Sequence, residues 1–380
     1  MCRVAGGVLD GGVSASGDPV LCDVTRADAS GRVPAAGPPA ALEIACDESG
    51  SEGEKLVGGN TDVFTHASVS LDVGDAAGCM REIRRRAPSP ALEYKANILL
   101  RGKHRSALVW LLGPSGPLRG RTHVHLVDKT FFAVGRLAGL LTGSAVRPAG
   151  AGPRPERWAG DAGAVARVLY REGPEVFGPG RWAALLEAFN DLARAREPGE
   201  AAAHAEEFSR IVETARARPD GARGRADEIV GLLWEARSRA GSFRALLSAG
   251  PGTVPALDPL IPAIVRTVAH WTAGGRPVSI VHDMQTTLTE ERIAQLREIP
   301  VAGGLTGLRL VDSRSDPRVQ VADVLAGAAR KIASEELNGR GDAELTALLR
   351  PYVDASSTWG DERSWSLLGP VADPPARPRP

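Results

Sequence analysis

The stretch ALEIACDESG, residues 41–50, opens the part of the chain whose pattern indicates a folded domain. Its first six residues, Ala41–Cys46, are mostly apolar and suit a β-strand, and acidic and turn-forming residues follow from Asp47 onward. A short apolar strand that ends in an acid recurs further along the chain.

Four further strands are expected from short apolar or alternating segments bounded by Gly, Asp or Ser. These strands are Val63–Leu71, His123–Val127, Val278–Val281 and Leu308–Val311. The last three are followed closely by an acid, which is Asp128, Asp283 or Asp312. The chain thus repeats the arrangement of strand and acid seen at its first strand.

Helical periodicity dominates the stretch from about 144 to 270, where no strand pattern occurs. The helices expected there are Trp182–Arg196, Ala201–Ala217, Ala226–Ala240 and Leu257–Thr272. After the fifth strand, Val319–Glu336 predicts a strong helix with one buried face formed by Val321, Leu325, Ala328 and Ile332.

Strands interleaved with helices predict an α/β fold in which helices flank a sheet. We expect a core in two parts, separated by a large helical insertion. The predicted ranges are 1–40 as a disordered extension, 41–143 and 273–345 as the two parts of the core, 144–272 as the helical insertion, and 346–380 as a C-terminal extension with a Pro-rich tail.

Composition excludes several classes of protein. Among 380 residues, 43% are hydrophobic and 24% are charged, as in ordinary globular proteins. No apolar run is long enough for a transmembrane helix, and the start of the chain lacks the features of a secretory signal. Four cysteines without a CxxC pair argue against a disulfide scaffold and a zinc knuckle. We expect a cytoplasmic protein without membrane contact.

The charge distribution is balanced overall and uneven locally. The 46 basic and 46 acidic residues exclude a strongly basic protein that coats nucleic acid. Residues 81–129, however, contain eleven Arg and Lys against three Asp and Glu. This stretch is either a surface that binds a nucleic-acid backbone or an ordinary solvated surface in an Arg-rich chain.

Acids at the ends of strands indicate a possible metal site. The carboxyl ends of parallel strands form the ligand crevice of open sheets, and carboxylates gathered there repel one another unless a cation lies between them. Hard cations such as Mg²⁺ or Mn²⁺ prefer oxygen ligands of this kind. The candidates are Asp47, Asp128, Asp283, Glu93 after the second strand, and Asp323 on the closing helix.

Simpler explanations exist for most of these acids. Asp47 can be a turn residue, and Glu93 can be an exposed acid before a helix. Asp128 can pair with Lys129 or an arginine, and Asp283 can cap the turn to the next helix. Glu48 should point to the opposite face from Asp47 if the strand continues, because successive side chains alternate. Asp323 is the hardest to explain away, because an unpartnered acid in mid-helix beside apolar residues costs several kcal/mol.

Several motifs occur together in one order along the chain. They are DESG at 47–50, Glu93 with Lys95, Asp128-Lys129, HDMQ at 282–285, VDS at 311–313 and QVADVLAGA at 320–328. In this order they resemble a bacterial family known as domain of unknown function 3800. The resemblance implies a ribonuclease H-like fold, with a mixed five-stranded sheet and a metal-dependent nuclease site.

The resemblance also implies roles for individual residues. Asp47, Glu93, Asp283 and Asp323 would hold two Mg²⁺ or Mn²⁺ ions for phosphodiester hydrolysis. Lys95 and Lys129 would neutralise the scissile phosphate. The residues expected to orient water or substrate are Gln320, Ser313 and His282, and the secondary candidates are Glu48, Asp128 and Asp312.

Two alternatives stay open. In the first, the core is a non-catalytic scaffold and the helical insertion binds a protein partner. In the second, the protein is a zinc hydrolase, since the alternation of His123 and His125 places both rings on one face of a strand. The third zinc ligand would be an acid or another histidine, and the histidines considered are His66, His104 and His282.

Overall fold

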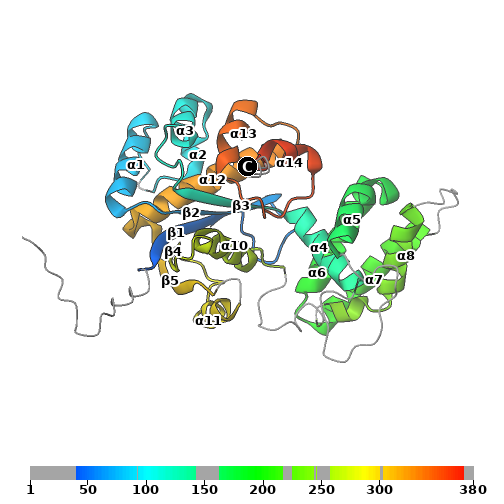
Figure 1. Ribbon diagram of the computed structural model, residues 1–380. Coiled ribbons are helices and arrows are strands. Elements are labelled where there is room, and N and C mark those ends of the chain that lie inside the picture. Colours follow the sequence, from blue (N-terminus) through cyan, green and yellow to red (C-terminus); the bar gives the residue numbers. More distant parts are fainter. Residues whose placement is uncertain are drawn as a thin grey trace, which may run out of the picture. The chain divides into compact units, whose positions relative to one another are not determined.

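The protein is described by a computed structural model (Figure 1). The described residues are 40–91, 93–142, 162–216, 225–243, 245, 257–299 and 303–371. The extension predicted over 1–40 lies outside them except for Ala40, and so does the Pro-rich tail from 372 onward.

Five strands form one mixed sheet in the order β3-β2-β1-β4-β5. β2 is antiparallel to β1 and β3, whereas β1, β4 and β5 are parallel. The strands are β1 (Leu42–Ser49), β2 (Val63–Val69), β3 (Thr122–Asp128), β4 (Val278–Asp283) and β5 (Leu305–Val311). The predicted α/β class is confirmed, and each predicted strand overlaps one of these.

The first strand is longer than its sequence suggested. β1 continues through Asp47 and Glu48 to Ser49, instead of ending at Cys46. The chain turns at Gly50, whose φ of 85° lies in the left-handed region and where a Cβ would collide with the Val63 carbonyl oxygen. Asp47 is therefore a strand residue and does not belong to the turn.

Two helices cover the two faces of the sheet (Figure 1). α12 (Pro317–Leu337) packs across β1 and β2, and α10 (Leu260–Thr272) packs on the opposite face. Alternate residues of β1 separate accordingly, because Ala45 belongs to the apolar core beneath α12 while Ile44 and Cys46 belong to the core beneath α10. The closing helix predicted over Val319–Glu336 is confirmed as part of α12.

Other helices surround the sheet without having been predicted. α1 packs on α12 and α3, and α2 also packs on α12. α13 and α14 pack on α12 from the C-terminal part of the chain, and α11 lies against β5. Their bounds are α1 (Val73–Arg86), α2 (Ala96–Leu99), α3 (Arg105–Leu112), α11 (Glu290–Glu298), α13 (Ala343–Leu349) and α14 (Glu362–Leu368).

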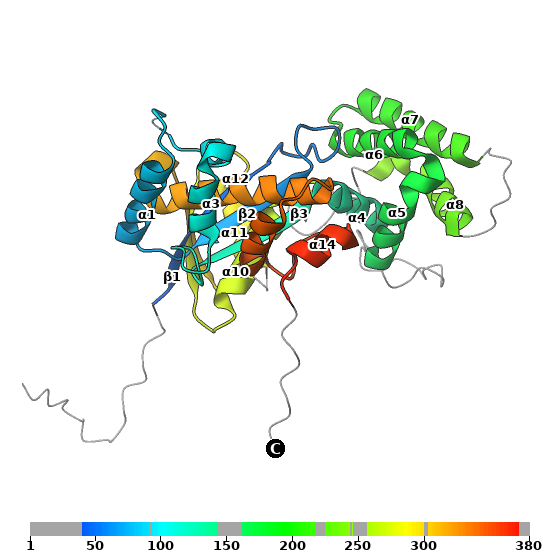
Figure 2. The same cartoon turned by 90° about the horizontal axis from the view of Figure 1, so that it is seen from above.

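A helical group with its own apolar core occupies the middle of the chain (Figure 2). It consists of α4 (Lys129–Leu141), α5 (Ala162–Phe177), α6 (Pro179–Arg194), α7 (Pro198–Arg216) and α8 (Arg225–Arg237). The buried Asn190 of α6 connects this group to the loop after β1, since its amide oxygen accepts from the backbone of Leu56 at 3.0 Å and of Val57 at 3.2 Å. The limits of the insertion predicted over 144–272 stay a prediction. α10 lies inside this range but packs on the sheet.

The outer edge of β3 is covered by residues 353–358. The Asp354 N–H donates to the Val124 carbonyl at 2.8 Å, and the Thr358 N–H donates to that of Leu126 at 2.9 Å. The Asp128 N–H in turn donates to the Thr358 carbonyl at 2.8 Å. Residues 353–358, predicted as part of an extension, thus continue the hydrogen bonding of the sheet.

Within the described ranges, no helix is both long and apolar enough to cross a membrane.

The closeness of α12 to α2 leads to a first prediction. A Cβ on Gly327 would overlap the Ala96 side chain, so Gly327→Ala should lower the free energy of unfolding by about 1–3 kcal/mol. Denaturant unfolding measures this change. Gly231→Ala on α8 is the matched control, because a Cβ there meets nothing within 4 Å and should stabilise by about 0.5–1 kcal/mol. Equal changes in the free energy of unfolding of the two variants would contradict the close approach of α2 to α12.

Candidate functional site

Three predicted acids occupy the same side of the sheet. Asp47 follows Ala45 on the α12 face of β1, and Asp283 follows Val281 on that face of the neighbouring strand β4. Asp323 lies on α12, the helix that packs on this face. Because β1 and β4 are parallel, with Cys46 opposite His282, the two strand acids lie at the same edge. Residues far apart in sequence therefore converge at one site.

Asp47 has a strongly perturbed carboxyl group. The residue is only 5% exposed, and burial is the main cause that raises its pKa well above the ordinary value. The negative charges of Glu48, Asp323 and Asp283 raise the pKa further, in that order. A hydrogen bond of 2.7 Å from the Glu48 N–H opposes the shift without removing it. Ionised Asp47 is thus in an unfavourable environment that a cation would relieve.

A lysine compensates part of the charge at Asp323. The Lys95 ammonium lies 2.9 Å from the Asp323 carboxylate and 2.6 Å from that of Glu93. The pKa of Asp323 is nevertheless raised, first by burial and then by the charges of Glu93 and Asp283, with Lys95 acting in the opposite direction. The hydrogen bond from Lys95 lowers the pKa of the more exposed Glu93. Lys95 is therefore the cation that the fold itself supplies to this cluster.

Ser313 links Asp283 to Glu93. It lies in the single 3₁₀ turn Ser313–Ser315 that follows β5. The Ser313 N–H donates to Asp283 Oδ1 at 2.9 Å, and its hydroxyl donates to Glu93 Oε1 at 3.3 Å. Ser313, which is expected to orient water or substrate, thus contacts two of the predicted acids.

Glu48 points to the opposite face of β1, as alternation predicts. Its carboxylate accepts a hydrogen bond from the Gln285 amide, and its Oε2 lies 3.7 Å from His282 Nε2. Burial raises the pKa of Glu48, whereas His282 and Gln285 lower it. Glu48 therefore belongs to a second polar layer beneath α10.

Histidines extend this layer across the sheet. His282 Nε2 lies 3.3 Å from His66 Nε2, and His66 Nδ1 lies 2.9 Å from the Thr267 hydroxyl of α10. The His282 Nδ1–H donates to the Asp283 carbonyl at 3.0 Å. Burial lowers the pKa of His66 well below its ordinary value, which keeps that ring neutral. His282 thus packs inside the protein, with its ring on the face away from Asp47.

His123 and His125 point to the same face, as predicted, and share an acid that the sequence did not reveal. His123 Nε2 lies 2.9 Å from Asp354 Oδ2 and His125 Nδ1 lies 3.6 Å from it, while the His270 ring stacks on His123 at 4.1 Å. Asp354 comes from the segment that covers β3, and no motif marked it. His104 lies elsewhere, in the turn before α3.

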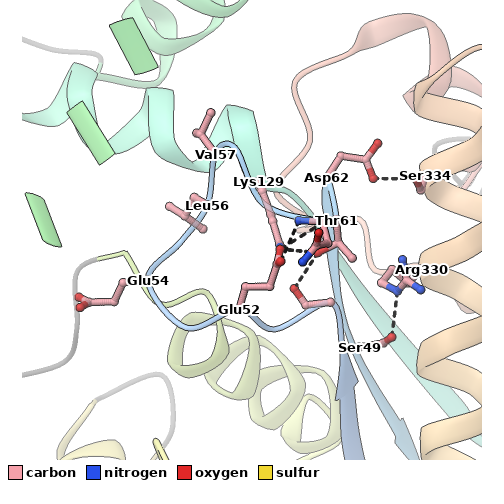
Figure 3. Close-up of polar contacts among 12 residues, drawn as sticks. Ser49, Glu52, Glu54, Leu56, Val57, Thr61, Asp62, Lys129, Arg330 and Ser334 are labelled. Carbon is pink, nitrogen blue, oxygen red and sulfur yellow. Dashed lines mark hydrogen bonds and ion pairs between the residues drawn. The ribbon is translucent and has the colours of Figure 1, made fainter. Parts of the chain in front are cut away.

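Lys129 does not join the acidic cluster. Its side chain is only 2% exposed, and its ammonium lies 2.7 Å from Glu52 and 2.5 Å from the Thr61 hydroxyl (Figure 3). It thereby secures the loop between β1 and β2. Its neighbour Asp128 caps α4 by accepting from the Phe131 N–H at 3.0 Å, and burial raises the pKa of Asp128 to about 6. These two residues have structural partners of their own.

The remaining candidates lie near the cluster or on its outside. Gln320 is half-buried on α12, one turn before Asp323. Asp312 is exposed and binds the Arg314 side chain at 2.9 Å. Gln285 contacts Glu48 but was not singled out, although it is the last residue of the HDMQ motif. Its partner could not be read from the sequence, because the contact joins residues 237 positions apart.

Several cations of the basic stretch 81–129 are already paired with acids. Arg85 and Arg86 both bind Glu82 at 2.6 Å. Further pairs join Arg105 to Asp342 and Glu344, and Arg121 to Asp75. The local excess of positive charge is therefore partly neutralised by acids from within and beyond the stretch.

The carboxylate chemistry of the acidic cluster favours a metal ion, whereas the arrangement of its side chains does not. Carboxylates that raise one another's pKa suit a hard divalent cation. Within the part of the chain that the structure describes, however, no three His, Cys, Asp or Glu side chains are arranged as a ready metal site. Lys95 already contacts two of the acids. A cation at this cluster would need side-chain rearrangement.

Comparison with known proteins adds no assignment. No protein family matches the chain, and neither does any curated protein or solved structure.

The perturbed pKa of Asp47 predicts an effect on stability. Because its pKa is higher in the folded chain than the ordinary 3.8, ionisation weakens folding as the pH rises above about 4. Asp47→Asn should therefore raise the melting temperature at pH 7 by about 2 °C or more, and the gain should vanish toward pH 4. Thermal unfolding measured across this pH range tests the prediction.

Asp316→Asn serves as the control of opposite sign. Although burial alone would raise the pKa of Asp316, its hydrogen bonds with Arg318, at 2.6 Å and 3.0 Å, lower it. This carboxylate stabilises the fold above the ordinary pKa of 3.8, and the contribution is lost as the pH falls through the lowered value. The variant should thus be less stable at pH 7. A loss of stability in Asp47→Asn as well would contradict the unfavourable environment of Asp47.

Proposed function

We propose that the protein is a divalent-metal-dependent nuclease or phosphodiesterase with a ribonuclease H-like fold. The observation that carries the proposal is the convergence of Asp47, Asp283 and Asp323 on the α12 face, with Asp47 buried among like charges. A structural role alone does not account for this cost, since none of the main influences on the pKa of Asp47 comes from a basic side chain of the described residues.

The resemblance to domain of unknown function 3800 supports the same proposal. It implies a mixed five-stranded sheet with acids on the first strand, a nearby helix, the fourth strand and the last helix of the core. In this chain the strand and last-helix positions correspond to Asp47 on β1, Asp283 on β4 and Asp323 on α12, whereas Glu93 precedes the helix α2. The motifs thus fall on elements that lie together, although they were identified from sequence order alone.

The acids and their neighbours suggest a division of roles. Mg²⁺ or Mn²⁺ held by Asp47, Asp283 and Asp323, with Glu93, would polarise a phosphate oxygen and lower the pKa of bound water. Lys95 would release Asp323 and contact a phosphate oxygen instead. Ser313 would keep Asp283 and Glu93 in position through its two hydrogen bonds.

Cleavage assays with single- and double-stranded DNA and RNA test the proposal. Asp47→Asn and Asp323→Asn should each reduce Mn²⁺- or Mg²⁺-dependent cleavage at least about a hundredfold, because each removes charge from the reaction centre. Asp227→Asn, at an exposed acid of α8, is the matched control and should retain activity. Cleavage that persists in EDTA, or survives both site substitutions, would refute the nuclease.

A non-catalytic interaction module is the second candidate. Two observations favour it: basic residues such as Arg105 and Arg121 are paired with acids, and the helical group has an apolar core of its own. Under this alternative, the core is a scaffold and the helices bind a protein partner. Absence of Mn²⁺ binding in calorimetry, together with a stable protein complex, would select this alternative over the nuclease.

A further inference from the structure

A groove between the helical group, α10 and the segment covering β3 contains an unusual arginine. The groove has a volume of about 290 Å³ and lies where α4, the first turns of α5, the start of α10 and the segment covering β3 meet. Its lining includes Phe131, Phe132, Arg136, Ala166, Pro262 and Thr358. Most of this surface is apolar, and none of it belongs to the acidic cluster.

Arg136 lacks a carboxylate partner among the described residues. Its Nε is buried and makes no hydrogen bond. Its guanidinium carbon lies 4.7 Å from the centre of the Phe132 ring, over which it stacks. Burial lowers the pKa of Arg136, and no acid among the described residues raises it again. Within the part of the chain that the structure describes, the guanidinium is therefore largely removed from water without an opposite charge.

Other buried cations of this protein form ion pairs with acids. Arg318 binds Asp316 at 2.6 Å, and Lys129 binds Glu52 at 2.7 Å. An uncompensated buried charge is costly, so folded chains pair such groups or use them to bind an opposite charge. At Arg136 the side chain borders a cavity, which leaves space for the missing charge to come from a ligand.

We propose that this groove binds a small organic anion: an apolar, ring-sized body that carries a carboxylate, sulfonate or phosphate. The guanidinium plane rests on Phe132, so its edge is available for paired hydrogen bonds to two oxygens of the anion. Phe131, Ala166 and Pro262 would contact the apolar body. The volume lies near the lower end for small-molecule sites, which are about 300–1,000 Å³.

A pair of matched fluorescent probes tests the proposal. Anilinonaphthalene sulfonate carries the anionic group, and anilinonaphthalene is the same ring system without it. The full-length protein should bind the sulfonate saturably at one site. Arg136→Met should weaken that binding about tenfold or more, because a hydrogen-bonded charge pair contributes about 1.5–3 kcal/mol. The affinity for the uncharged probe should not change.

Two further variants separate the groove from general dye binding. Arg216→Met is the matched control, since exposed Arg216 stacks over Trp234 at 4.2 Å but lies outside the groove. It should leave both affinities unchanged. Ala166→Trp should fill the groove and abolish binding of both probes, with folding checked by thermal unfolding. Sulfonate binding that is unaffected by Arg136→Met, or that Arg216→Met weakens equally, would overturn the proposal.

Discussion

The packing of α12 across β1 and β2 is the constraint on which the rest of the structure depends. The helix presents small residues to its neighbours, and Gly327 in particular allows α2 to approach without a side chain between them. This close packing places Asp323 over the edge where β1 and β4 end. Without it, Asp47 would lose the burial that is the main cause of its raised pKa, together with the contribution of the Asp323 charge.

The two faces of β1 contain different kinds of polar chemistry. Beneath α12 the acids lie near one lysine, so the local charge is negative and only partly balanced. Beneath α10 the polar groups are mainly histidines and hydroxyls, and His66 contacts both His282 and the Thr267 hydroxyl. A single strand separates them, because Asp47 and Glu48 are neighbours that point in opposite directions. A ligand at the α12 face would therefore contact carboxylates and a lysine, whereas a ligand at the α10 face would contact mainly histidines and hydroxyls.

The sequence predicted elements more reliably than contacts. Strong β patterns such as VFTHASVSL located every strand, and the stripe from Val321 to Ile332 located α12. α1 was not predicted although Ala76, Cys79, Met80 and Ile83 have helical spacing, because the charged residues around them obscure this apolar pattern. The roles expected for Lys129 and the partner of His123 could not be deduced, since Glu52 and Asp354 are brought to them only by the tertiary fold.

The pairing of residues 353–358 with β3 affects how readily two copies of the chain could associate. An open strand edge is a template on which a second chain can add, and natural sheets protect such edges. Here Asp354 and Thr358 occupy the backbone groups of Val124 and Leu126 that would otherwise be available. Residues 353–358 therefore occupy an edge that could otherwise pair with a second chain, and shortening the protein before Val353 would expose the backbone of β3.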